Sequence, residues 1–251
     1  MEMSASPRLP SPAPATGGRP IEWTLRDVAV GLGLYIGFFV INIIVAAPFL
    51  GFGETSTEFY VASIVTSGIW EMSLVGVAAR LTFVKYGGSW ERLGLRRPNW
   101  ATLGWAVAAV VATFAFAAGY GAILDIFNFD ALKSSCDDQL PKELLNNRTA
   151  LIVTSAFAIA VAPVCEEIFF RGFGFTGFWR AWGLVLGVVA SAALFSVAHV
   201  GADMHKTIIP ILGIGCILAL TYWRSGNLMS SILAHMANNI FAVAALWTVD
   251  C

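Results

Sequence analysis

Two adjacent glutamates and an arginine interrupt an apolar run in the second half of the chain. The segment Pro163–Gly172 carries Glu166, Glu167 and Arg171 among hydrophobic residues. On a helix, Glu167 and Arg171 are i,i+4 neighbours on one face, where a salt bridge would satisfy both groups. Glu166 points about 100° away from them and is left free. A free carboxylate in an apolar helix is a candidate general base for activating water, although a purely structural pairing with arginines would give the same pattern.

Two histidines lie in other apolar segments of the same half. Phe195 and His199 are one turn apart at the end of one segment, and His235 and Asn239 share the same spacing in the last. Each pair alone would be an ordinary packing or polar contact between helices. The chain has only three histidines, however, and two of them lie in apolar segments of the half that carries Glu166. This grouping favours one shared site.

A carboxylate, two imidazoles and an amide in one bundle core could hydrolyse an amide bond. Glu166 and a histidine would activate water and protonate the leaving amine, and the remaining donors would stabilise the oxyanion. The set Glu166, His199, His235 and Asn239 could instead hold a divalent metal such as zinc. Zinc sites more commonly use three His or His/Glu ligands without an amide. We therefore expect no firm cofactor, with zinc as the alternative.

Composition indicates the elements that must position these residues. Of the 251 residues, 57% are hydrophobic and only 12% are charged, against about 25% charged in soluble domains. A membrane-spanning helix needs about 20 apolar residues. Segments of about that length predict an all-α, polytopic transmembrane helix bundle of about seven spans (six to eight): Val28–Gly53, Phe59–Ala79, Ala101–Leu124, Thr149–Phe170, Ala181–Ala198, Thr207–Trp223 and Gly226–Val249.

The chain divides into three predicted parts. Residues 1–20 are rich in Pro, Ser, Ala and Gly and predict a disordered tail. Residues 21–100 hold the anchoring helices and a basic loop, which we expect to form a surface hairpin. Residues 101–249 hold the candidate catalytic core.

Charge distribution predicts the orientation and excludes one class of partner. With the N-terminus in the cytoplasm, one cytoplasmic loop holds four basic residues, Lys85, Arg92, Arg96 and Arg97, as the positive-inside rule favours. We expect an integral protein of the cell membrane. The net charge of −1 gives no reason to expect nucleic acid.

The mechanism requires Glu166 and His199 to share a depth in the bilayer. Regular alternating spans would leave them near opposite sides. A longer, tilted helix from Thr149 to about Arg180 would put Glu166 near its middle, and Pro163 would kink that helix. We therefore expect one such long helix.

The ordered set Glu166-Glu167-x-x-x-Arg171, Phe195-x-x-x-His199 and His235-x-x-x-Asn239 resembles the CAAX protease and bacteriocin-processing (CPBP, or Abi) family of intramembrane peptidases, over roughly residues 101–249. The resemblance implies that Glu166 and His199 activate water. It implies that His235 and Asn239 bind the tetrahedral intermediate or help to hold a metal, and that Glu167, Arg171 and Phe195 support them. The implied substrates are prenylated, leader or other membrane-associated peptides.

Two other functions are consistent with the same residues. A proton-coupled transporter would use Glu71, Glu166, Glu167 and His199 as a relay. A membrane scaffold or immunity protein would keep the fold without the chemistry. Glu71 lies within a predicted span outside the motifs, where it would line the cavity or bond across helices. The His-Glu-x-x-His zinc motif and the Gly-x-Ser-Gly nucleophile motif are absent from the sequence.

Overall fold

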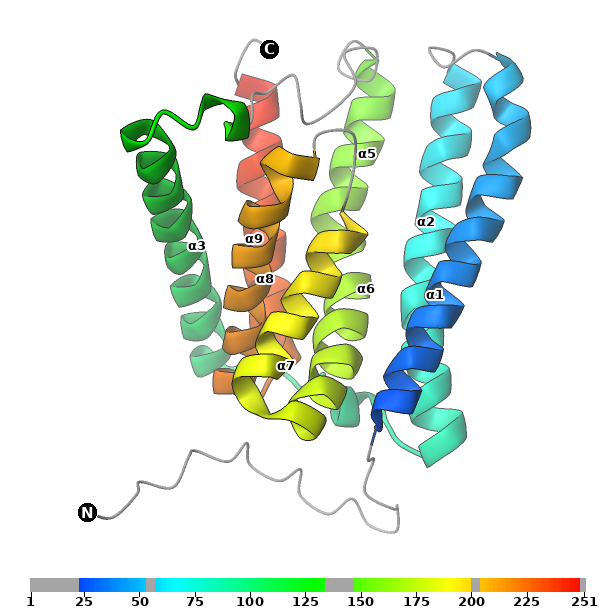
Figure 1. Ribbon diagram of the computed structural model, residues 1–251. Coiled ribbons are helices and arrows are strands. Elements are labelled where there is room, and N and C mark those ends of the chain that lie inside the picture. Colours follow the sequence, from blue (N-terminus) through cyan, green and yellow to red (C-terminus); the bar gives the residue numbers. More distant parts are fainter. Residues whose placement is uncertain (1–22, 53–56, 134–146, 200–203, 249–251) are drawn as a thin grey trace.

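The computed structural model describes residues 23–52, 57–133, 147–199 and 204–248, and these residues form an all-helical bundle without strands (Figure 1). The predicted disordered tail, residues 1–20, lies outside the described residues. The long helices are α1 (Leu25–Ala46), α2 (Thr57–Ala79), α3 (Trp100–Ile126), α5 (Arg148–Ala160), α7 (Thr176–Ala198), α8 (Met204–Ser225) and α9 (Leu228–Thr248). The shorter elements are η1 (Ala47–Phe52), η2 (Arg80–Val84), η3 (Trp90–Leu93), η4 (Asp130–Leu132), α6 (Ala162–Glu166) and η6 (Glu167–Phe175).

Six of these helical stretches are long and apolar enough to cross a membrane, and one of them accounts for two crossings. The stretch Arg148–Ala198 has 51 residues. At about 1.5 Å per residue it would measure roughly 75 Å, more than twice the hydrocarbon core of about 30 Å. Within α7, Gly183 has φ 81° and ψ 178°, which no helix accommodates, and the chain reverses direction there (Figure 1). The stretch is therefore two passes, in agreement with the predicted bundle of about seven spans.

The first of these two passes carries the glutamates. It runs through α5, α6, η6 and the start of α7, and Glu166 lies 18 residues after Arg148 and 17 before Gly183. The helix is interrupted at Val161, directly before the turn that contains Pro163, because proline lacks the N–H that would continue the ladder. Glu166 thus lies midway along a long, broken helix, as the sequence predicted.

Aromatic packing joins the first two helices to this broken helix. The ring of Tyr35 in α1 stacks on Trp70 of α2 with centroids 5.1 Å apart, and it contacts Phe169 of η6 at 5.6 Å. Leu74, one turn after Trp70, is fully buried in the same cluster. Stacked and tilted rings at these separations add to the apolar burial. The anchoring helices α1 and α2 therefore pack directly on the segment that carries the glutamates.

The basic loop between α2 and α3 is more deeply anchored than the predicted surface hairpin. Arg96 and Arg97 are exposed, as expected, but Leu93 is fully buried in the main core. Gly94 has φ 88°, a left-handed conformation that favours glycine, and its carbonyl accepts from the Leu228 N–H at 2.8 Å. The surface-hairpin prediction missed this anchor because Leu93 and Gly94 find their partners in segments that lie far away in the sequence.

Candidate active site

A widened helical turn positions the two glutamates. Glu166 is the last residue of α6, and from Glu167 the backbone continues as the π-helix η6, whose nine residues are all buried. π-helical turns close i→i+5 hydrogen bonds, are rare, and occur frequently at functional sites. They add backbone to each turn and so change which side chains face the neighbouring helices. In this turn the chain brings Glu166 and Glu167 toward two other helices, α7 and α9.

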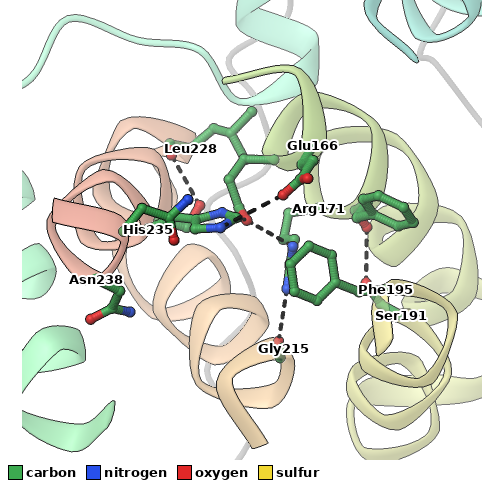
Figure 2. A network of polar contacts seen from close by, with 12 residues as sticks. Glu166, Arg171, Ser191, Phe195, Gly215, Leu228, His235 and Asn238 are labelled. Carbon is green, nitrogen blue, oxygen red and sulfur yellow. Dashed lines mark hydrogen bonds and ion pairs between the residues drawn. The ribbon is translucent and has the colours of Figure 1, made fainter. Parts of the chain in front are cut away.

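The two predicted histidines approach Glu166 from different helices. His199, which follows the last residue of α7, has its Nε2 3.5 Å from Glu166 Oε1. His235 of α9 has its Nε2 3.6 Å from Glu166 Oε2 (Figure 2). The required shared depth of Glu166 and His199 is therefore present. Each carboxylate oxygen of Glu166 faces one imidazole nitrogen.

The second nitrogen of each ring fixes its orientation. His199 Nδ1 lies 2.8 Å from the carbonyl oxygen of Phe195, which only accepts, so Nδ1 carries the proton and donates. His235 Nδ1 lies 3.1 Å from Glu167 Oε1 and donates to that carboxylate. In neutral rings the two Nε2 atoms are then acceptors, as is the Glu166 carboxylate. An acceptor-rich group of this kind suits a water molecule that gives up its protons.

The predicted Glu167–Arg171 salt bridge is confirmed. Arg171 Nη1 donates to Glu167 Oε1 at 2.7 Å, and neither side chain has any exposed surface. Arg171 Nη2 also donates to the Gly215 carbonyl of α8 at 3.3 Å (Figure 2). A buried pair needs such additional bonds, because desolvation of both charges is costly. Glu167 therefore connects the buried cation to His235.

Phe195 packs among the charged groups. Its ring lies 4.1 Å from the Arg171 guanidinium carbon, 4.4 Å from the His199 ring and 5.7 Å from the His235 ring, measured to centroids. A cation over an aromatic face is stabilised by the ring quadrupole, the more so when it is desolvated. Phe195 therefore packs against the buried arginine and both imidazoles, and we keep the supporting role implied for it as a prediction.

Asn239 is one turn beyond His235, but its amide is engaged elsewhere. Its Nδ2 donates to the Ala158 carbonyl of α5 at 2.8 Å, which ties α9 to the helix that carries Glu166. The neighbouring Asn238 donates to Thr113 of α3 at 3.3 Å. The structure thus brings together Glu166, His199 and His235, and puts Asn239 on the adjoining turn, bonded to α5.

The predicted residues do not form a metal-binding group. Among the described residues, no three His, Cys, Asp or Glu side chains gather as ligands for one ion. The two imidazoles face different oxygens of Glu166, and Glu167 is already bonded to Arg171 and His235. Zinc therefore stays the alternative prediction for this site, without a ligand group found among the described residues.

Glu71 is an acidic residue within a membrane pass for which the three motifs predicted no role or contact. It lies in α2, outside the motif segments, and its Oε2 atom is buried without a hydrogen-bond partner among the described residues. Its only signal in the sequence was its position as an ionisable residue within an apolar span. Such a position suggests a function but does not indicate which residues lie beside it.

The family model described as type II CAAX prenyl endopeptidase, Rce1-like, matches residues 148–241. The match confirms the resemblance inferred from the motifs, and it begins at α5 rather than at the start of α3. All the predicted motif residues fall inside it. No match was found among curated proteins or among solved structures.

Proposed function

We infer that this chain, whose residues 148–241 belong to the Rce1-like type II CAAX prenyl endopeptidases, is an intramembrane endopeptidase that hydrolyses peptide bonds with a water activated by Glu166 and His199. The family supplies the general class of activity. The catalytic type and the roles of individual residues are our proposal.

One observation carries the proposal: both oxygens of Glu166 face a histidine Nε2, at 3.5 and 3.6 Å, halfway along a membrane pass. Two acceptors separated by such a distance need a proton between them or a bridging water. In the proposed reaction Glu166 takes one proton from this water as the water oxygen adds to the scissile carbonyl carbon. General bases of this kind contribute about 10²–10⁴ in rate.

The remaining groups complete the proton balance. The proton taken by Glu166 passes to the leaving amine nitrogen as the C–N bond breaks, and the products are a carboxylic acid and an amine. His235 would donate at Nε2 only with protons on both ring nitrogens, while its Nδ1 stays bonded to Glu167. His235 and the Asn239 amide are our candidates for stabilising the oxyanion, worth about 10²–10³ per donor.

The substrate we propose is a membrane-associated peptide, either prenylated at its C-terminus or a leader peptide. Glu166 and His235 are almost completely buried, whereas His199 keeps 33% of its side-chain surface exposed. This difference supports entry of the substrate from the His199 side.

We further propose that the protein resides in the cell membrane with its N-terminus in the cytoplasm. One end of the bundle is where α1 and α3 begin and α8 ends (Figure 1). The elements at this end carry or adjoin five basic residues, Arg26, Lys85, Arg96, Arg180 and Arg224. Basic residues next to membrane spans favour the cytoplasmic side.

The test is peptide-library cleavage by the purified full-length protein in detergent, with and without a metal chelator. We expect hydrolysis that the chelator does not abolish, and selection for peptides with an apolar or prenylated end. Loss of cleavage with chelator and its return with zinc would contradict the metal-free mechanism. The absence of any cleavage, combined with substrate-driven flux in proteoliposomes, would replace the peptidase with the transporter.

A further inference from the structure

We propose that a cavity between α3 and α8 binds one membrane glycerophospholipid, with an acyl chain between the two helices and the phosphate at the mouth of the cavity. The proposal goes beyond the proposed function and does not depend on it. The cavity is a second site, because its lining includes none of Glu166, His199 and His235, and because α3 lies outside the segment that matches the family.

The first observation is the shape of the cavity. At its deep end the two helices touch, since a Cβ at Gly213 of α8 would overlap the ring of Phe116 of α3. From that level α3 and α8 diverge toward the end of the bundle at which α3 ends and α8 begins (Figure 1). The cavity between them has a volume of about 500 Å³, within the range of roughly 300–1,000 Å³ of ligand sites. It therefore has room for part of a lipid chain.

The second observation is the polarity of the lining, which changes along the membrane passes. The apolar lining residues lie within the passes: Phe116, Ala117, Leu124, Pro210 and Ile214. The charged lining residues lie near or beyond the ends of the passes: Asp125, Lys133 and Lys206. A phospholipid in a bilayer has the same order, with its chains in the hydrocarbon core and its phosphate at the surface. The lining therefore fits a lipid better than a water-soluble ligand.

The third observation is a pair of ammonium groups at the mouth. Lys133 is held there by ion pairs with Asp125 at 2.8 Å and with Asp130 at 2.7 Å, and it keeps 43% of its side chain exposed. Lys206 lines the cavity from the opposite wall, in α8. Ammonium groups bind phosphate as point charges, and basic pockets between membrane helices bind lipid headgroups. The two lysines are therefore the groups to which we assign the phosphate.

The fourth observation is a buried donor in the cavity wall. The hydroxyl of Tyr120 is buried and has no hydrogen-bond partner among the described residues. Its ring stacks on Phe116, with centroids 6.2 Å apart, so its position is fixed. A buried hydroxyl without a partner costs stability. An ester carbonyl of a bound lipid only accepts, and it would satisfy this donor just below the phosphate.

The cavity also borders the helices that carry the active site. Thr113 of its lining accepts from Nδ2 of Asn238 in α9 at 3.3 Å. Ile214 of its lining precedes Gly215, whose carbonyl accepts from Arg171. A lipid in the cavity would therefore contact α8 on the side away from Arg171. Binding to the folded protein alone would raise its unfolding temperature.

The test adds dioleoylphosphatidylglycerol to the purified, delipidated full-length protein in detergent. Native mass spectrometry counts the bound molecules, and thermal unfolding gives an independent measure of binding. We expect one tightly bound molecule per chain and a higher unfolding temperature. Dioleoylglycerol has the same chains but no phosphate, and we expect it to bind at least about tenfold more weakly, because it lacks the charged hydrogen bonds.

Two glycines of α3 provide a matched pair of variants. A Cβ at either Gly121 or Gly119 would meet no atom within 4 Å, but only Gly121 lines the cavity. Gly121→Leu should therefore lower the affinity for dioleoylphosphatidylglycerol at least about tenfold, because the new side chain occupies the space of the acyl chain. Gly119→Leu should leave the affinity unchanged. Tyr120→Phe should lower it roughly two- to tenfold, and it is the alternative test if Gly121→Leu does not fold.

The outcomes are independent of peptidase activity, because binding is measured without substrate. Wild type that retains no phospholipid would overturn the inference, as would equal affinities of wild type, Gly121→Leu and Tyr120→Phe. Equal binding of dioleoylglycerol and dioleoylphosphatidylglycerol would overturn the assignment of the phosphate to the lysines. Unchanged phospholipid binding in Gly121→Leu with a raised KM for a prenylated peptide would assign the cavity to the substrate instead and overturn the inference.

Discussion

The helix α1 and the π-helix η6 are both apolar segments within membrane passes, yet they meet their surroundings in opposite ways. In α1 most side chains face outward, including Phe38, Ile41 and Ile44. In η6 all nine residues are buried, among them Glu167 and Arg171. α1 needs only length and hydrophobicity to span the membrane. The segment η6 needs specific partners from α7, α8 and α9, since its charges must be compensated inside the protein.

This difference predicts that substitutions among the buried charged residues of η6 and their partners affect catalysis and stability strongly. Substitutions at the Asp27–Lys85 pair, where α1 begins and η2 ends, should affect neither by much. The expected effects fall in order from the Glu166–His199 pair, through the Arg171 ion pair and Asn239, to Lys85.

The largest effect is expected from His199→Ala. We expect a loss of about 10²–10⁴ in kcat, because the imidazole partner of the base is removed. The double variant Glu166→Ala/His199→Ala should be scarcely worse than either single variant, since residues that act as a unit are not additive. Steady-state kinetics of the three proteins, with circular dichroism to check folding, measures this. Additive losses would show that the two residues do not work together.

The next effect is on stability, from Arg171→Met. Its removal leaves Glu167 buried without its cation, which typically costs about 3–5 kcal/mol. The double variant Arg171→Met/Glu167→Gln should recover part of that loss, because it removes both charges. Denaturant titration in mixed micelles compares the two. A single variant as stable as wild type would mean that the pair does not hold η6 in place.

A smaller effect is expected from Asn239→Ala. If the amide stabilises the oxyanion, kcat falls by about 10². If it serves only the hydrogen bond to Ala158, the loss is about 1 kcal/mol of stability, with kcat unchanged. We expect the first result, with a fall in kcat smaller than that for Glu166. Parallel measurements of kcat and unfolding temperature separate the two roles.

The smallest effect is expected from Lys85→Gln, just outside the membrane pass of α2. Lys85 pairs with Asp27, which also accepts from Tyr86 at 2.7 Å and so keeps a partner in the variant. The hydrogen bond to Asp27 raises the pKa of Lys85. Its contribution to stability is therefore complete below the unfolded pKa of about 10.4 and is lost as the pH rises through the folded pKa.

Thermal unfolding across the alkaline range measures this last prediction. Wild type should lose stability at high pH, and Lys85→Gln should lose less, whereas Lys85→Arg should keep the pair. Peptidase activity should be the same in all three at neutral pH. A large loss of activity in Lys85→Gln would contradict the claim that the Asp27–Lys85 pair does not influence the active site.

Much of this architecture could be predicted from local sequence. Span length and composition predicted the helical bundle, and Pro163 predicted the interruption before Glu166. The i,i+4 spacing predicted the ion pair of Glu167 and Arg171. These features depend on residues close together in the chain.

Other features depend on contacts between distant residues and carried no local signal. The π-helical turn at Glu167, the bonding of Asn239 to Ala158 and the burial of Leu93 all arise only when separate helices pack. The spacing of His235 and Asn239 predicted that they share one face of a helix. It did not predict that His235 bonds to Glu167 and Asn239 to the Ala158 carbonyl.

The most direct test of the account is the turnover of a membrane-associated peptide by purified Glu166→Gln protein beside wild type. Gln keeps the size of the side chain and removes the base. We predict cleavage by wild type, and a loss of at least about 10² in the variant at an unchanged unfolding temperature. Turnover by Glu166→Gln at the wild-type rate would contradict the claim that Glu166 activates the water.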